Sequence, residues 1–210
     1  MKRLRLGLVL TLLALVVLGG LWVWWELGAG TRPKTLTRNQ SEIAGLLEGA
    51  GWVSPHLAGA KLYMVAYRDC ADCNTFQARE FAKLKAAGVD TRVIEIARPD
   101  KNGLAQSTPL ERTSVAELWV NRNFGLYERW TAAPSGTWTA PGLAAADGDA
   151  GRTAVIDAGR ALVTKLTPLM KANGVGPGFP TLVWWDKAGQ MRGCVCGASS
   201  FDAVAQELGA

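Results

Sequence analysis

Residues 61–73 read KLYMVAYRDCADC, an apolar run followed at once by two cysteines three positions apart. The run Lys61–Tyr67 has the length and apolar character of a buried strand. A helical pattern follows over residues 73–87, and Thr91–Ala97 alternates as a second strand would. A strand, a helix and a strand in this order predict a βαβ unit with a parallel pair of strands.

A long stretch at about 98–176 is predicted to form a helical insertion. Residues 111–130 and 152–173 carry apolar residues at helical spacing. Residues 134–151 are rich in Gly, Pro, Ala and Thr, which is typical of a loop. The insertion separates the βαβ unit from the strands that follow it.

Two more strands and a helix are predicted after the insertion. The apolar run within residues 178–186 predicts a strand, 187–190 a turn, and Met191 onward an antiparallel partner. Ser199 and Ser200 are expected to cap a last helix. Its apolar positions recur at i, i+3, i+4 and i+7: Phe201, Val204, Ala205 and Leu208.

The N-terminal segment predicts a membrane anchor. Leu6–Trp25 carries no charge and is long enough to span a hydrocarbon core of about 30 Å. A cleaved signal sequence is the alternative, but such sequences have a shorter apolar region of roughly 7–15 residues. We therefore expect a cytoplasmic N-terminus at 1–5, a single transmembrane helix at 6–27, and a domain on the periplasmic side of a bacterial inner membrane. Residues 28–57 are predicted to be a linker with a short helix, capped by Ser41.

The net charge of +5 gives no reason to expect nucleic-acid binding. The excess of basic residues flanks the apolar segment, and no basic stripe with interleaved aromatic residues follows. An exported domain meets an oxidising environment, where cysteines are usually paired. The four cysteines form two close couples, Cys70 with Cys73 and Cys194 with Cys196.

The element order β-α-β, helical insertion, β-β-α resembles that of the α/β thioredoxin superfamily. Two motifs carry the resemblance: Cys-x-x-Cys lies between the first strand and its helix, and Phe179-Pro180-Thr181 opens the third strand. The resemblance covers residues 58–210, and the helical insertion makes the chain most similar to the bacterial periplasmic disulfide oxidase and isomerase branch. Together with the predicted anchor, it implies a membrane-anchored thiol–disulfide oxidoreductase that acts on protein disulfides without a cofactor or a metal.

The resemblance implies roles for both motifs. Cys70 would be exposed at the helix start, where unpaired N–H groups and the helix dipole favour the thiolate. Cys73, one turn on, would attack the mixed disulfide and release the partner. The Phe179–Pro180 bond is expected to be cis, and the backbone of Phe179 to bind the substrate chain as an added strand, next to Thr181.

Cys194 and Cys196 lie near the end of the predicted fourth strand, at the same sheet edge as Cys70. Two strand spacings, about 10 Å, would separate them from the first pair. We consider two roles equally: a second redox couple that relays electrons to Cys70 and Cys73, and a local disulfide that pins the strand to the last helix.

Charged residues near the first pair bear on the direction of exchange. Many relatives have a buried carboxylate six residues before the first cysteine, where this chain has Met64; Glu95 on the second strand is the candidate proton relay instead. Asp72 should raise the pKa of Cys70, which favours a reductase or isomerase over a strong oxidase. Arg68 could offset Asp72.

Other functions remain open at this stage. The cysteines could be passive staples, or Cys70 and Cys73 could form half of a zinc site with the second pair. The domain could instead be a non-catalytic scaffold or assembly factor in an envelope complex. His56 is the only histidine, and it lies in a Ser-Pro loop. We expect a monomer, with protein thiols and disulfides as substrates and a membrane redox partner.

Overall fold

The computed structural model describes residues 19–20 and 32–210. In that part of the chain, no helix is both long enough and apolar enough to cross a membrane. The predicted N-terminus at 1–5 and nearly all of the predicted anchor at 6–27 lie outside the described residues.

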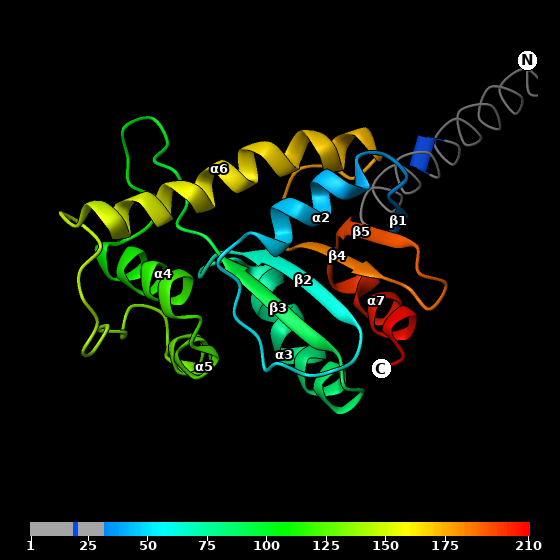
Figure 1. Ribbon diagram of the computed structural model, residues 1–210, viewed down its shortest axis with the longest axis horizontal. Coiled ribbons are helices and arrows are strands. Elements are labelled where there is room, and N and C mark those ends of the chain that lie inside the picture. Colours follow the sequence, from blue (N-terminus) through cyan, green and yellow to red (C-terminus); the bar gives the residue numbers. More distant parts are fainter. Residues whose placement is uncertain (1–18, 21–31) are drawn as a thin grey trace, which may run out of the picture.

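A five-stranded mixed sheet forms the centre of the fold, with strand order β1-β5-β4-β2-β3 (Figure 1). The strands are β1 (Lys34–Thr35), β2 (Lys61–Ala66), β3 (Asp90–Glu95), β4 (Thr181–Trp185) and β5 (Met191–Val195). The pair β2–β3 is parallel, and β4 is antiparallel to both β2 and β5. The predicted βαβ unit and the antiparallel pair after the insertion are therefore confirmed.

Helices cover both faces of the sheet. Side chains from α3 (Ala71–Ala86) and α7 (Phe201–Leu208) share one apolar cluster with alternate residues of β2, β4 and β5. Those of α2 (Gln40–Glu48) and α6 (Ala150–Ala172) share a second cluster with the intervening strand residues. Figure 1 shows the long helix α6 running across the molecule, with α4 (Pro109–Asn121) and α5 (Phe124–Ala132) gathered at one end.

The helix predicted over residues 111–130 is two helices. Arg122 has φ 50°, a left-handed conformation that ends α4. Asn123 then begins α5, and its side chain accepts the backbone N–H of Leu126 at 2.9 Å. Helical periodicity continues across this break, which is why the pattern alone predicted a single helix.

The predicted serine caps are wrong. Asn39, not Ser41, precedes α2, and its side chain makes no capping hydrogen bond. Ser200 precedes α7 but also makes none, because a short 3₁₀ turn at Ala198–Ser200 leads directly into the helix. The segment 28–57 also differs from a plain linker, since β1 pairs with β5 and Leu36 is fully buried.

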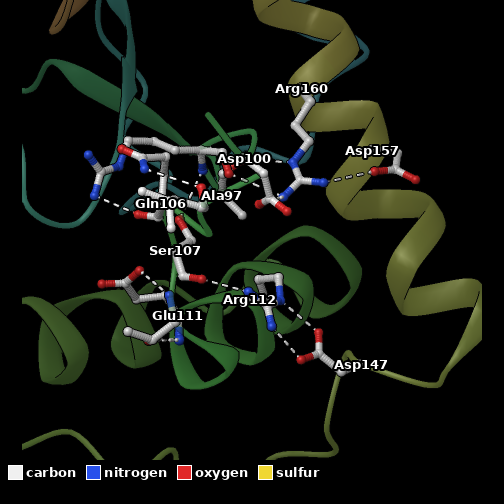
Figure 2. Close-up of polar contacts among 12 residues, drawn as sticks. Ala97, Asp100, Gln106, Ser107, Glu111, Arg112, Asp147, Asp157 and Arg160 are labelled. Atoms are coloured by element: carbon white, nitrogen blue, oxygen red, sulfur yellow. Dashed lines mark hydrogen bonds and ion pairs between the residues drawn. The ribbon is translucent and has the colours of Figure 1, made fainter. Parts of the chain in front are cut away.

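Arginines fix the connection between β3 and α4 (Figure 2). Arg160 of α6 donates to the carbonyl oxygen of Ala97 at 3.3 Å. Arg112 of α4 donates to the carbonyl oxygen of Ser107 at 2.6 Å and to Asp147 at 2.7 Å. The insertion is thereby attached to the end of β3, where Glu95 lies.

Candidate active site

Cys70 and Cys73 form a disulfide at the start of α3. Cys70 is the N-cap residue, and its sulfur accepts the backbone N–H of Cys73 at 3.1 Å. Its own N–H donates to the carbonyl oxygen of Tyr67 at 3.1 Å, in the turn that leaves β2. The sulfur of Cys70 therefore lies where free helical N–H groups and the helix dipole stabilise negative charge.

The prediction that Cys70 is exposed is wrong for this oxidised form. Cys70 is 3% exposed and Cys73 2%. The bond to Cys73 turns the first sulfur toward the apolar cluster beneath α3, and partly buried Tyr67 and Phe179 pack against that cluster. The sequence motif predicts that Cys70 lies at the start of the helix, but it does not predict which side chains bury its sulfur.

The loop before β4 lies beside this disulfide. The peptide bond between Phe179 and Pro180 is cis. The rings of Tyr67 and Phe179 meet edge to face, with centroids 5.2 Å apart. Thr181 pairs with Val65 across the β2–β4 ladder, and its hydroxyl donates to the carbonyl oxygen of Gly178 at 2.7 Å. The structure thus brings both sequence motifs to one end of the sheet.

Cys194 and Cys196 form a second disulfide. Both are buried, at 0% and 1% exposure, and both belong to the apolar cluster that contains Cys70 and Cys73. Among the described residues no cysteine is free. The same residues contain no group of three or more His, Cys, Asp or Glu side chains that could hold a metal ion.

Glu95, at the end of β3, is a buried carboxyl. Its register partner in the parallel strand is Ala66, so its side chain lies on the α3 face of the sheet. Desolvation raises its pKa to about 8, although the nearby charge of Arg68 lowers the pKa and that of Glu111 raises it. Within the described chain, the Oε2 atom of Glu95 has no hydrogen-bond partner. Glu95 is therefore a group that holds a proton near neutral pH.

Comparison with known proteins rests on solved structures, because no protein-family profile and no curated protein matches this sequence. BcfH from Salmonella enterica Typhimurium is 15% identical, with a TM-score of 0.50, and the match covers 96% of this chain and 92% of that one. The element order, the disulfide at the start of α3 and the cis-proline before β4 decide the fold class. The chain has a thioredoxin-like fold.

Two weaker similarities are to a periplasmic thioredoxin-like protein and to DsbA1. A periplasmic thioredoxin-like protein from Salmonella enterica serovar Typhimurium is 11% identical, with a TM-score of 0.42, over 82% of this chain and 97% of that one. Reduced DsbA1 from Neisseria meningitidis is 15% identical, with a TM-score of 0.30, over 79% and 96%. These two similarities carry no conclusion about this chain, and the similarity to BcfH bears on the fold alone.

The insertion in this thioredoxin-like fold lines a cavity together with Arg68 and Asp69, the two residues before Cys70. It has a volume of about 240 Å³ and is lined by residues from four segments: Arg68, Asp69, Thr108, Leu110, Glu111, Trp130, Pro134, Ser135, Gly136 and Trp138. Arg68 donates to the carbonyl oxygen of Ala133 and lies over the ring of Trp130 at 5.7 Å. Sequence reasoning missed this site because no local pattern joins four distant segments.

His56 stands apart from these groups. It is exposed, and its nearest aromatic neighbour is Trp52, with ring centroids 6.0 Å apart. The structure therefore does not bring His56 together with the cysteine pairs, the proline loop or Glu95.

Proposed function

We propose that this chain is a thiol–disulfide oxidoreductase that acts on protein disulfides through Cys70 and Cys73. The observation that carries the proposal is the disulfide at the N-terminus of α3, next to the cis Phe179–Pro180 bond. In the reduced form, the thiolate of Cys70 attacks a substrate disulfide, forms a mixed disulfide and expels one substrate thiolate. Cys73 then attacks Cys70, which restores the internal disulfide and releases the second substrate thiolate.

Substrate contact is assigned to the loop Phe179–Thr181. Phe179 and Thr181 also line an apolar hollow of about 110 Å³, together with Met170 and Leu166 of α6. An extended substrate segment would bind through the backbone of Phe179 and place an apolar side chain in this hollow. Since Cys70 is buried in the oxidised form, attack on it requires side chains around it to shift, and we assign this movement to Tyr67 and Phe179, which pack against its cluster.

Charges near Cys70 favour a reductase or isomerase over a strong oxidase. Asp72 lies in the first turn of α3, where a carboxylate opposes formation of the thiolate. Arg68 could offset it, but its guanidinium is held by the insertion, at the carbonyl oxygen of Ala133 and over Trp130. The carboxylate therefore acts with little compensation from that arginine.

Glu95 is assigned a proton-transfer role toward Cys73. Cys73 lies on the face of α3 that packs on the sheet, and Glu95 lies on the face of the sheet that α3 covers. In the β2–β3 ladder, Glu95 pairs with Ala66, two positions beyond the pair of Val93 and Met64. A buried acid with a pKa of about 8 can give up and recover a proton within the physiological range. Such a group would accept the proton of Cys73 when that thiol becomes the attacking thiolate.

The cellular setting is proposed from the sequence. An anchor at 6–27 would hold the domain at 58–210 on the periplasmic side of the inner membrane, as a monomer that receives electrons from, or gives them to, a membrane redox partner. Two disulfides in one small domain suit an oxidising compartment.

A trapping experiment tests the catalytic assignment. The Cys73→Ser variant should accumulate a mixed disulfide between Cys70 and a protein substrate, because the resolving thiol is missing. The matched Cys70→Ser variant should trap no substrate and should reduce insulin disulfides only at the background rate. Non-reducing electrophoresis and mass spectrometry of the adduct measure both results. If the Cys70→Ser variant keeps its turnover, the catalytic assignment is wrong.

The scaffold alternative has one observation in its favour, the burial of Cys70. A binding module would need no access to this sulfur. It predicts that neither serine variant changes function and that no covalent adduct forms, so the same experiment separates the two functions.

A further inference from the structure

The two disulfides share one buried environment. All four cysteines are at most 3% exposed, and all four belong to the apolar cluster between the sheet and helices α3 and α7. In this form a reductant in solution has poor access to either bond, and under the proposed function it reaches Cys70 when Tyr67 and Phe179 shift. The apolar cluster that buries Cys194 and Cys196 also contains the other sulfur pair.

The strand register places the second pair at the end of the sheet near Pro180. Cys194 pairs with Leu182 of β4, and Leu182 pairs with Met64 of β2, so these three side chains lie on the same face. Thr181 is the partner of Val195. Cys196 thus follows the last ladder pair, on the side of the sheet where the proline loop enters β4.

Helix α3 turns Cys73 toward this second pair. Cys73 and Phe76 lie on the buried face of α3, one turn apart. The ring of Phe76 meets that of Phe201 in α7 at 4.9 Å, and Arg79 donates to the carbonyl oxygen of Ala198 at 3.2 Å. Helix α3 therefore packs against the segment that follows Cys196, and Cys73, on the same buried face as Phe76, points into the cluster that contains Cys196.

A structural staple is a poor explanation for a bond between positions two apart. A disulfide stabilises a fold mainly by closing a loop in the unfolded chain, and the effect grows with loop length. The bond between Cys194 and Cys196 has a sequence separation of 2 and closes a minimal loop. Its contribution to stability is consequently the smallest that such a bond can make.

We propose that Cys194 and Cys196 are a second redox centre, which exchanges two electrons with Cys70 and Cys73 inside the protein. The inference rests on the proposed function and extends it. The thiolate of Cys73 attacks the sulfur of Cys196, breaks the Cys194–Cys196 bond and leaves Cys194 as a thiolate, which takes up a proton. Cys70, as a thiolate, then attacks Cys73, forms the Cys70–Cys73 disulfide and releases Cys196 as a thiolate. One disulfide is reduced and one dithiol is oxidised, so electrons balance in either direction.

The test follows reduction of each pair in the oxidised full chain under native conditions. Dithiothreitol is added, samples are quenched with acid and alkylated, and mass spectrometry reports the redox state of each pair over time. In the wild-type chain, Cys194–Cys196 should become reduced after Cys70–Cys73. In the Cys70→Ser/Cys73→Ser variant, its reduction should be slower by at least about tenfold, because the internal route is gone. In urea, both chains should reduce this bond at the same rate.

Three outcomes would overturn the inference. Equal native rates in the two chains would mean that dithiothreitol reaches the second pair directly. A Cys194–Cys196 bond that stays oxidised in the wild-type chain while Cys70–Cys73 is reduced would mean an inert bond. If Cys70–Cys73 itself resists reduction, the proposed function fails, and the relay fails with it.

A pair of trapping variants tests which sulfur carries the exchange. Cys70→Ala/Cys194→Ala leaves Cys73 with Cys196 and should form a disulfide between them on mild oxidation. Cys73→Ala/Cys194→Ala leaves Cys70 with Cys196 and should remain mostly reduced. Absence of the Cys73–Cys196 bond in a folded first variant would refute the proposed step.

Discussion

Replacing Glu95 by Gln should remove most of the pH dependence of folding between pH 5 and pH 7. The carboxyl of Glu95 is 4% exposed, and desolvation raises its pKa from 4.5 to about 8. The charge of Arg68 lowers that pKa but does not cancel the effect of burial, and the charge of Glu111 raises the pKa further. The folded chain therefore keeps a proton on Glu95 at pH values where the unfolded chain has lost it.

The sign and size of the effect follow from this difference. Below pH 4.5 both forms hold the proton, and the stability that neutral Glu95 provides is fully present. As the pH rises, the unfolded chain ionises first and is stabilised, so each pH unit lowers the free energy of unfolding by about 1.4 kcal/mol. From pH 5 to pH 7 the loss is about 2–3 kcal/mol, and it levels off above pH 8.

The assay is urea unfolding at pH 5, 6 and 7, followed by tryptophan fluorescence. The matched control is Glu42→Gln, which makes the same chemical change at an exposed position of α2. The wild-type chain and this control should both lose about 2–3 kcal/mol over the range, and Glu95→Gln close to none. In other carboxyls, hydrogen bonds and ion pairs outweigh desolvation and lower the pKa, so they titrate below this range: Glu48, Asp90 and Glu117. A Glu95→Gln variant with the wild-type decline would show that Glu95 ionises normally in the folded chain.

Two further substitutions test the surroundings of Glu95, and a third serves as a control for the second. Arg68→Met removes the charge that lowers the pKa of Glu95, so the free energy of unfolding should continue to fall beyond pH 8; an unchanged plateau in the same urea assay would exclude this coupling. Gly51→Ala would place a Cβ atom 2.4 Å from the ring of Trp119, whose indole N–H donates to the carbonyl oxygen of Glu95, and should cost about 1–3 kcal/mol. Gly45→Ala, in α2 with open space around it, should instead stabilise by about 0.5–1 kcal/mol; thermal unfolding that ranks the two alanine variants together would contradict the steric argument.

Periodicity predicted the elements that bury a continuous apolar face. The strands around Met64 and Val183 and the helix from Phe201 each carry enough apolar residues for one pattern to dominate. Periodicity failed where the conformation of a single residue sets the end or the start of a helix. The left-handed Arg122 divides one predicted helix, and Ser41 lies beyond the true start of α2. These features depend on backbone conformation at one position, which hydrophobic spacing does not encode.

The candidate site was predictable in its chemistry and not in its surroundings. Both motif segments, Cys70 with Cys73 and the Phe179–Pro180 bond, lie where the element order requires. The burial of Cys70 was not predictable, because Tyr67 and Phe179, which pack against its cluster, come from two loops that are far apart in the sequence and meet at one end of the sheet.

The insertion sets the electrostatics of a site to which it contributes no cysteine. It supplies Trp130, against which Arg68 packs, and it draws that arginine to Ala133. It also supplies Trp119, whose indole holds the backbone of Glu95 at 2.7 Å. One segment thus diverts the cation that could stabilise a thiolate and shields the acid that could receive a proton. Under the proposed function, an insertion that left Arg68 free to approach Cys70 would favour its thiolate and make the pair more oxidising.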